Sequence, residues 1–286
     1  MAFRNVKAFV DAQVNNGSIV TTSFRKTVLG GGAGTWVDLS QGGGNPSANF
    51  YASGPLEAAR LTSSKGIWSG GDTGTKTKHL SNILLMSPSA NLAASTFMLC
   101  DYLLYYPFID MDSDIEQDFD NTTASINRYT DGVGVQAFLV AQGTYIGGGQ
   151  YFITYTNQKG ETGRKSQLCI SNSAALAGSL VSSGNNSTSL KQFGCFIPLQ
   201  GDDTGIRSVQ NIQFLTPNGG IAALVLCKPL ASVLIREVNT PVEKSFLKDN
   251  LSLPRIHDGA YLNFLVHPAA APTGTFVQGI IDFVWN

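Results

Sequence analysis

Short segments in which apolar and polar residues alternate recur along most of the chain, with Gly and Pro between them. A period of two is typical of a β-strand, because successive side chains of a strand point to opposite faces. In QYFITYT, for example, Tyr151, Ile153 and Tyr155 share one face. The following NQKG supplies a turn and SQLCI resumes the pattern, so residues 150–171 are predicted to form a hairpin.

Further segments have the composition and length of strands, and the last of them places Val277, Ile281, Phe283 and Trp285 on one face with Gly279. Many short strands without helices between them favour an all-β chain, mainly an antiparallel β-sandwich or jelly roll, over an α/β fold. The C-terminal segment is therefore expected to be a strand tied into a sheet. The predicted strands are residues 18–29, 82–87, 96–106, 133–142, 193–199, 209–215, 221–227, 260–266 and 275–285.

Helix signals are few. Residues 239–250, NTPVEKSFLKDN, offer Thr240 as an N-cap, Pro241 at the first helical position and Glu243 to close a capping box. Residues 3–13 are predicted to form a second short helix that packs on a neighbour.

The stretch from Gly30 to about Gly74 is rich in Gly, Ser and Thr, with isolated apolar residues that fit no strand period. It is interpreted as an extended arm or large loop, so residues 1–77 are expected to form an N-terminal helix and Gly-rich arm and residues 78–286 a β-sandwich core. The arm carries four large aromatic residues that are candidate anchors for another subunit, because rigid aromatic side chains dominate interface energies. A glycan-binding groove would use the same chemistry, and the pattern does not separate the two uses. The four residues are Trp36, Phe50, Tyr51 and Trp68.

The amino-acid composition is unusually poor in charged residues, which implies that much of the surface is uncharged. Charged residues make up 14% of the chain, against roughly 25% in a typical soluble domain. Such a surface is expected where much of it is covered by partners, although a monomer coated with Ser, Thr and Asn remains an alternative. With 19 basic and 20 acidic residues, nothing favours a nucleic acid or an anionic membrane as partner.

The start of the sequence lacks the apolar segment of a signal peptide, and no stretch has the 18 or more apolar residues of a membrane span. Assembly in a cytoplasm is therefore expected. The four cysteines stand singly within apolar runs, which predicts buried, unpaired thiols rather than a zinc site. They are Cys100, Cys169, Cys195 and Cys227.

The densest group of carboxylates is IDMDSDIEQDFDN, in which Asp110, Asp112 and Asp114 alternate. These three are candidate ligands for Ca²⁺ or Mg²⁺, but an EF-hand loop would have Gly in place of Ile115 and Glu in place of Asn121. A solvated acidic loop is the alternative. No other cofactor is indicated.

No sequence pattern supports an enzyme. The glycines at 30–34 lack the spacing of a phosphate loop, no HExxH or GxSxG motif occurs, and His79, His257 and His267 have no accompanying motif. In GDDTGIRSV the acidic pair at 202–203 is interpreted as a tight turn locked by Arg207, with a ligand-facing loop as the alternative.

A glycan hydrolase would need two carboxylates at catalytic separation in a cleft. Asp101, Asp110, Glu116 and Asp282 are available, but their spacing favours no pair.

Several segments between about residue 78 and the C-terminus resemble structural, capsid-decorating proteins of tailed-phage virions. The segments are KHLSNILLMSPSA, YYPFIDMDSD, INRYTDGVGVQAFLV, FITYTNQKGETGR, FIPLQGDDTGIRSVQ, ALVLCKPLA and LPRIHDGAYLNFLV. The resemblance implies a virion component with a cement or decoration role, whose partners are the major capsid protein and copies of itself. It implies no catalytic activity, and it does not extend to residues 1–77. A receptor- or glycan-binding module of a tail or head fibre is the alternative function.

Overall fold

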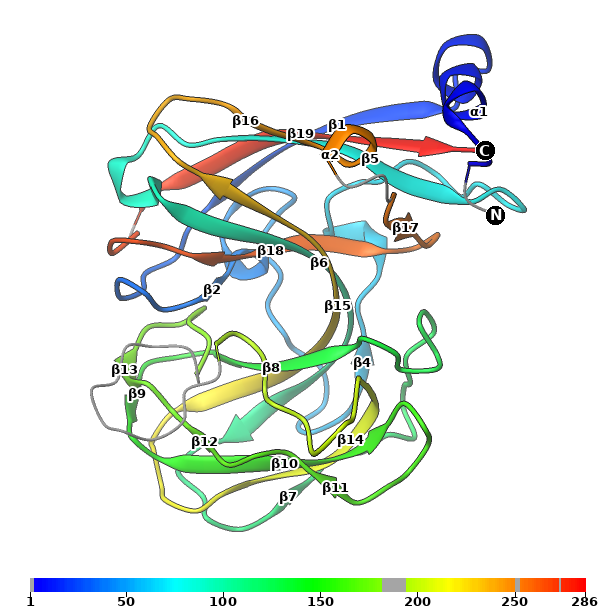
Figure 1. The fold of residues 1–286 in the computed structure, drawn as a ribbon. Helices are drawn as coiled ribbons and strands as arrows, with labels where there is room; N and C mark the ends of the chain where they lie inside the picture. The colour runs from blue at the N-terminus through cyan, green and yellow to red at the C-terminus, as the bar shows by residue number, and fades with distance from the viewer. Residues whose placement is uncertain (1–2, 182–193, 250–252, 273) are drawn as a thin grey trace.

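Three β-sheets stacked around two long bent strands make up most of the molecule (Figure 1). The computed structural model describes residues 3–181, 194–249, 253–272 and 274–286. Strands account for 44% of the chain and helices for 9%, which confirms the predicted all-β class. All named strand pairs are antiparallel.

The central sheet contains the two longest strands, which bend so that each contributes to both halves of the molecule (Figure 1). In the upper half β18 pairs with β6, and in the lower half β8 pairs with β15. The sheet has the order β2 (Val37–Asp38), β18 (Tyr261–His267), β6 (Ser95–Asp110), β15 (Ile221–Ile235) and β8 (Gln136–Ala141), with β4 (Ala59–Arg60) also on β6.

An upper and a lower sheet cover the two ends of this central sheet (Figure 1). The upper sheet is β16 (Val242–Ser245), β5 (Lys78–Met86), β19 (Phe276–Trp285), β1 (Ile19–Thr27) and β3 (Gly44–Asn45), with β17 (Arg255–Ile256) on β5. The lower sheet is β11 (Arg164–Lys165), β10 (Gln150–Asn157), β14 (Ile206–Phe214) and β7 (Gln117–Asp118), with β12 (Cys169–Ile170) on β10; β9 (Tyr145–Gly147) and β13 (Ser173–Ala175) form a separate pair.

Alternation along β6 distributes its side chains among three hydrophobic cores. Phe97 and Leu99 enter the upper core, Cys100 and Tyr102 enter a core on the opposite face, and Leu103 enters the lower core. Successive strand residues point to opposite faces, so one strand supplies all three cores as it crosses the molecule. The two halves therefore share the backbone of β6 and β15.

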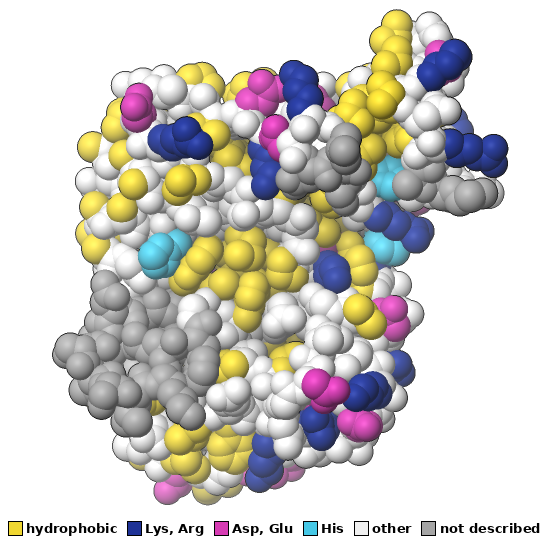
Figure 2. Space-filling view, viewed as in Figure 1, with side chains coloured by type: hydrophobic (Ala, Val, Ile, Leu, Met, Phe, Trp, Pro, Cys, Tyr) yellow, Lys and Arg dark blue, Asp and Glu magenta, His cyan; other side chains and the backbone are white. Residues whose placement is uncertain are grey.

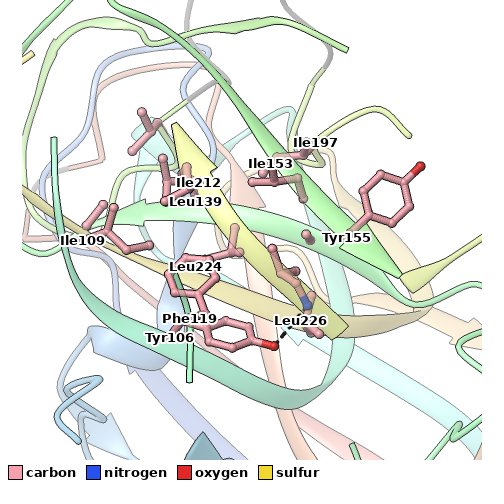
Figure 3. Packing of buried hydrophobic residues seen from close by; sticks show 14 of the residues in the cluster. Tyr106, Ile109, Phe119, Leu139, Ile153, Tyr155, Ile197, Ile212, Leu224 and Leu226 are labelled. Carbon is pink, nitrogen blue, oxygen red and sulfur yellow. Dashed lines mark hydrogen bonds between the residues drawn. The ribbon is translucent and has the colours of Figure 1, made fainter. Parts of the chain in front are cut away.

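The lower core forms where the central and lower sheets face each other (Figure 3). Leu224 and Leu226 of β15 meet Ile153 of β10 and Ile212 of β14 there, and all four are fully buried. The Tyr106 hydroxyl accepts a hydrogen bond from the Val209 amide at 3.2 Å, which satisfies a polar group inside this apolar environment.

Helical structure is limited to short pieces. α1 (Val6–Val10) begins at Asn5, whose side chain accepts a hydrogen bond from the Ala8 amide, and continues into the π-helical turn η1 (Asp11–Asn15). This confirms a helix near residues 3–13. The other pieces are the 3₁₀ turns η2 (Leu39–Gln41), η3 (Ser63–Lys65) and η4 (Ala90–Leu92) and the single turn α2 (Phe246–Asp249). None of the helices in the described part of the chain is long and apolar enough to cross a membrane.

Most predicted strands are present, often with shifted ends. The hairpin after residue 150 is confirmed, because β10 pairs with both β11 and β12, and β19 buries Val277, Ile281 and Phe283. The strand predicted at 193–199 is wrong over residues 194–199, which form a turn and irregular backbone, and residue 193 lies outside the described residues.

The helix predicted for residues 239–250 is wrong over most of its length. Val242 to Ser245 form strand β16, which pairs with β5 in the register Val242 to Leu85 and Ser245 to Asn82. Helix begins only at Phe246. A capping signal is a local preference, and backbone pairing along a sheet edge outweighs it here.

The expected separation of a Gly-rich arm from a core is also wrong. Strands β2, β3 and β4 of this segment pair with β18, β1 and β6. The segment therefore joins both the upper and the central sheet, and its isolated apolar residues are part of the cores. The buried apolar residues between 30 and 70 are Val37, Leu39, Tyr51, Ala58, Leu61 and Ile67.

A buried carboxylate ties this segment to the central sheet. Asp38 accepts hydrogen bonds from the Ser40 amide at 2.9 Å, the Ser40 hydroxyl at 2.7 Å, the Tyr51 hydroxyl at 2.7 Å and the Tyr102 hydroxyl at 2.9 Å. Burial raises the pKa of Asp38, although the hydrogen bonds from Tyr51, Ser40 and Tyr102 oppose the increase. Because Tyr102 belongs to β6, the network fixes the segment to the longest strand of the molecule.

Lys26 of β1 is fully buried and points into the loop that follows η2. Its ammonium donates hydrogen bonds to the carbonyl oxygens of Gly42 and, at 3.1 Å, Pro46. Burial lowers the pKa of Lys26 to about 8, while the charge of Asp38 acts in the opposite direction. A buried ammonium surrounded by carbonyl groups holds the loop against the upper sheet.

Comparing the wild type with Lys26→Met should show a stability difference that depends on pH. The pKa of Lys26 is about 8 in the folded protein, against the ordinary value of 10.5 for a lysine side chain, so between these values the unfolded state binds more protons and the stability contributed by Lys26 rises with pH. We expect the wild type to gain on the order of 3 kcal/mol relative to the variant from pH 8 to pH 10.5. Urea unfolding at several pH values measures this gain, with the exposed Lys65→Met as control; a constant difference would contradict it.

Candidate interaction site

The Phe50–Phe108 groove, defined by Phe50, Tyr51, Phe108, Gly220 and Ile221, is a surface depression of about 490 Å³ at the lower end of the central sheet. Ala52, Gln142, Gly143 and Thr144 complete its lining. Phe50 is 68% exposed, Phe108 43% and Ile221 47%, so three large apolar side chains stand at its surface. No lining residue is ionisable apart from the buried Tyr51.

Phe108 stands out through its backbone as well as its exposure. Its φ of 57° lies in the left-handed region, which bulky residues with a Cβ rarely adopt. Such a conformation costs on the order of 1–3 kcal/mol and persists only where the surroundings impose it. Phe108 lies where the β6–β15 register shifts, and its ring is left 43% exposed. Strained and exposed residues of this kind gather at ligand-binding sites.

More apolar surface adjoins the groove. Ile146 of β9 is 77% exposed and lies beside Gly219, where a Cβ would meet its Cδ1 at 3.7 Å. Scattered single hydrophobic residues are normal on a soluble protein, but contiguous ones mark interaction sites. Figure 2 shows hydrophobic side chains gathered along the lower edge of the molecule, and others between the two halves.

The acidic loop begins two residues after Phe108 and borders the groove. Asp110 is the ladder partner of Ile221, and five carboxylates occupy residues 110–118 without a basic residue among them. The Asp112 amide donates a hydrogen bond to the Asp110 carboxylate at 2.9 Å, and Gln117 closes the loop through the amide and the carbonyl of Asp110. The groove is thus neutral inside and negative at one rim.

The predicted cation site is not formed. Asp110, Asp112 and Asp114 are all exposed, and nowhere in the described ranges do three His, Cys, Asp or Glu side chains gather in a way that could hold a metal ion. The Asp110 carboxylate instead accepts a hydrogen bond from the loop backbone. Alternation along an extended segment does not bring side chains around a common centre.

The four predicted interface aromatics do not form one site. Phe50 lines the groove, and Trp68 is 55% exposed beside a different depression near residues 21–23. Tyr51 is 1% exposed, so it is a core residue and not the exposed anchor that was expected. Trp36 is partly buried, with its ring 5.1 Å from that of His267. Of the four, Phe50 and the buried Tyr51 line the groove, and only Phe50 is exposed there.

The cysteines and His79, which were considered for chemistry, are structural residues. All four cysteines are buried and unpaired, as predicted, and burial raises the pKa of Cys169 and of Cys195 to about 12, which disfavours the reactive thiolate. Burial also lowers the pKa of His79, whose Nδ1 hydrogen-bonds to the Leu253 carbonyl at 3.0 Å.

The acidic turn at 202–203 is locked by a different arginine from the one predicted. Asp203 accepts hydrogen bonds from the Arg164 Nε at 2.9 Å and the Tyr155 hydroxyl at 2.6 Å, whereas Arg207 donates to backbone carbonyls of Asp131 and Gln158. Burial opposes ionisation of Asp203, but the hydrogen bonds from Arg164, Tyr155 and Asn157 outweigh it and lower the pKa. In Figure 3 Tyr155 lies at the margin of the lower core with its hydroxyl directed away from it.

A second apolar surface lies at the opposite end of the molecule. Phe9 and Ala12 of the N-terminal helix pack with Val284 of β19, while Val6, Val10 and Val14 are 59%, 44% and 74% exposed. We call these three residues the valine stripe. Their spacing of four places them along one side of the helix.

Phe50 and Tyr51 were predicted from the sequence as interface residues, and both line the groove. Phe108 lies just beyond the predicted strand 96–106, and no sequence pattern singled it out. Its positive φ and its nearness to Phe50 and Ile221 arise from the fold.

Comparisons with known proteins add no family. The chain matches no protein-family model and no curated protein. Among solved structures it aligns with the VP2 subviral particle of infectious bursal disease virus at 8% identity, over 99% of this chain and 88% of that chain, with a TM-score of 0.17. The Gt strain of the same virus aligns at 7% identity, over 100% and 87%, also with a TM-score of 0.17. Likeness at that level carries no argument about fold or function, so the function has to be argued from the surface itself.

Proposed function

We propose that this chain is a non-enzymatic structural subunit of a tailed-phage virion, a cement or decoration protein that stabilises the head through contacts with the major capsid protein and with copies of itself. The observation that carries the proposal is the pairing of a charge-poor composition, 14% Asp, Glu, Lys and Arg, with contiguous exposed hydrophobic residues around the Phe50–Phe108 groove. Contiguous exposed hydrophobic residues mark surfaces that bind a partner. The resemblance of the segments between residue 78 and the C-terminus supports a virion as the assembly.

A structural, non-enzymatic role is consistent with the contacts that two of the carboxylates make within the fold. Of the four that a glycan hydrolase could use, Asp101 is buried in a pair with Arg128 and Asp282 accepts hydrogen bonds from Thr21 and Asn82 on the upper sheet. Asp101 and Asp282 therefore both have partners within the fold. Many modest contacts repeated around a symmetric shell stabilise it strongly without any deep pocket.

Particles that lack this protein should assemble but release their genome at a lower temperature than complete particles. The reason is that a cement subunit adds contacts between capsid subunits that the shell does not need for assembly. Heating both kinds of particle and following DNA release by fluorescence of an intercalating dye measures the effect. Adding the purified protein back should restore the higher temperature.

A receptor- or glycan-binding module is the second candidate, and the exposed rings of Phe50 and Phe108 favour it, because aromatic faces also stack on sugar rings. It makes the opposite prediction in the same experiment. Particles lacking the protein would then be as heat-stable as complete ones but would fail to attach to host cells.

A further inference from the structure

We propose that the valine stripe of one copy occupies the Phe50–Phe108 groove of a second copy, so that the chain associates head to tail with itself. The inference deepens the proposed function by naming the contact between copies, and it rests on that function only in requiring that copies meet. It needs no capsid and can be tested on the purified protein.

The valine stripe is an exposed row of apolar residues on a helix that is held in place, as in helices that bind a groove of another protein. The N-terminal helix is anchored to its own molecule by Phe9 and Ala12, so it is held in place while Val6, Val10 and Val14 face outward. Figure 1 shows α1 projecting from the upper end of the molecule. An amphipathic helix that lays apolar residues spaced by about one turn into a hydrophobic groove is a recurring mode of protein recognition.

The groove has the matching chemistry. Phe50, Phe108 and Ile221 offer apolar surface around a depression of about 490 Å³. The lining includes Gly143 and Gly220, which have no side chains to keep a helix backbone at a distance.

Charges around the two surfaces are complementary. Residues 3–16 carry Arg4 and Lys7 against a single acidic residue, Asp11; the Lys7 side chain is 83% exposed and forms an ion pair with Asp11 at 2.6 Å, so Arg4 supplies the unbalanced positive charge. The rim of the groove carries the five carboxylates of residues 110–118, and Asp110 stands directly beside Ile221. Opposite charges at the margin of an apolar contact speed association and fix its orientation. This complementarity favours the helix of a second copy over an uncharged sugar as occupant.

The two surfaces lie far apart on one molecule, which determines the kind of contact. In Figure 1 α1 is at the upper right, whereas β9 and the start of β15, which border the groove, are at the lower left. A helix therefore cannot reach the groove of its own chain, and the contact joins two different patches. Such a contact gives a twofold dimer only if both copies exchange it reciprocally, and otherwise generates a ring or a filament.

Sedimentation velocity of the full chain over a range of concentrations tests the proposal, with one variant on each side of the contact. Val14→Asp places a charge on the most exposed valine, and Phe108→Gly removes the ring while glycine accepts the positive φ without strain. Both should weaken association about tenfold or more, the effect of losing a central apolar contact. Val133→Asp, at a valine that is 48% exposed elsewhere, should have no effect. Circular dichroism establishes that each variant is folded.

A charge exchange tests the orientation. Lys7→Glu should weaken association, Asp112→Lys should weaken it as well, and the two together should restore it, whereas Lys65→Glu should change nothing. Added salt should weaken the wild-type contact, because exposed charges are screened.

Two results would overturn the inference. One is a chain that stays monomeric at every concentration at which it is soluble. The other is association that both Val14→Asp and Phe108→Gly leave unchanged; if Phe108→Gly abolished binding to a panel of saccharides in that case, the groove would be a glycan site. If the variants lose self-association while particle heat stability is unchanged, the contact between copies is supported and the cement role does not depend on it.

Discussion

A chain from which residues 30–70 are deleted is expected not to fold. The deletion removes six buried apolar side chains from the cores, at about 1.5–3 kcal/mol each, which amounts to on the order of 10 kcal/mol. That is comparable with the whole stability of a typical domain, about 5–15 kcal/mol. It also removes Asp38, which accepts the hydrogen bond of the buried Tyr102 hydroxyl. Loss of the cooperative thermal transition in circular dichroism checks this.

A matched variant separates the loss of buried residues from the loss of exposed ones. Phe50→Ser combined with Trp68→Ser changes two residues of the same segment that are 68% and 55% exposed, so it should fold with nearly unchanged stability. A deleted chain that retained a cooperative transition would show that this segment is dispensable, as an independent arm would be.

Arg128→Met is expected to destabilise the protein by about 3–5 kcal/mol, because it leaves the buried Asp101 without its counter-charge. Arg128 Nη2 and Nε donate to the two oxygens of Asp101 at 2.8 Å and 2.9 Å, and both residues are almost inaccessible to solvent. Arg128 also donates to the Tyr102 carbonyl at 2.9 Å. Differential scanning calorimetry should show a melting temperature lower by roughly 10 °C.

The pH dependence of this variant identifies the cause. Burial raises the pKa of Asp101 even with Arg128 present, although the hydrogen bonds and charge of Arg128 oppose the increase. Without Arg128 the penalty on the buried carboxylate is greatest above its raised folded pKa and declines as the pH falls from there toward the pKa of Asp in the unfolded chain, so the difference from wild type should shrink as the pH falls. The double variant Asp101→Leu with Arg128→Met should recover part of the loss at neutral pH. A difference that is the same at every pH would point to lost packing of the Arg128 side chain instead.

Sequence alone predicted the features that depend on local alternation. The strands around Tyr151 and Ile281 were found because period-two burial leaves a direct trace in the residue pattern. The burial of the cysteines followed from their apolar neighbours in the same way. The helix at Thr240 was predicted wrongly, because the strand partner that displaces it lies about 150 residues earlier in the chain, in β5.

Features that depend on long-range contacts left no such trace. The segment around Tyr51 enters the core through two-residue strands, which are too short to show a period. The pairing of Asp203 with Arg164 rather than Arg207 depends on how β10 and its neighbours bring two loops together. The groove joins Phe50, Phe108 and Ile221 from three distant segments, so only the folded chain reveals it.

The passage of β6 and β15 through both halves of the molecule has a mechanical consequence. The paired strands extend from Ser95 and Ile235 at one end to Asp110 and Ile221 at the other, without a linker between them. A pull applied at the upper end is carried to the lower end by covalent backbone and by a ladder of hydrogen bonds that are loaded together. Although three register shifts interrupt the pairing, these strands join the two halves continuously, so tension passes between the two ends without crossing a loop.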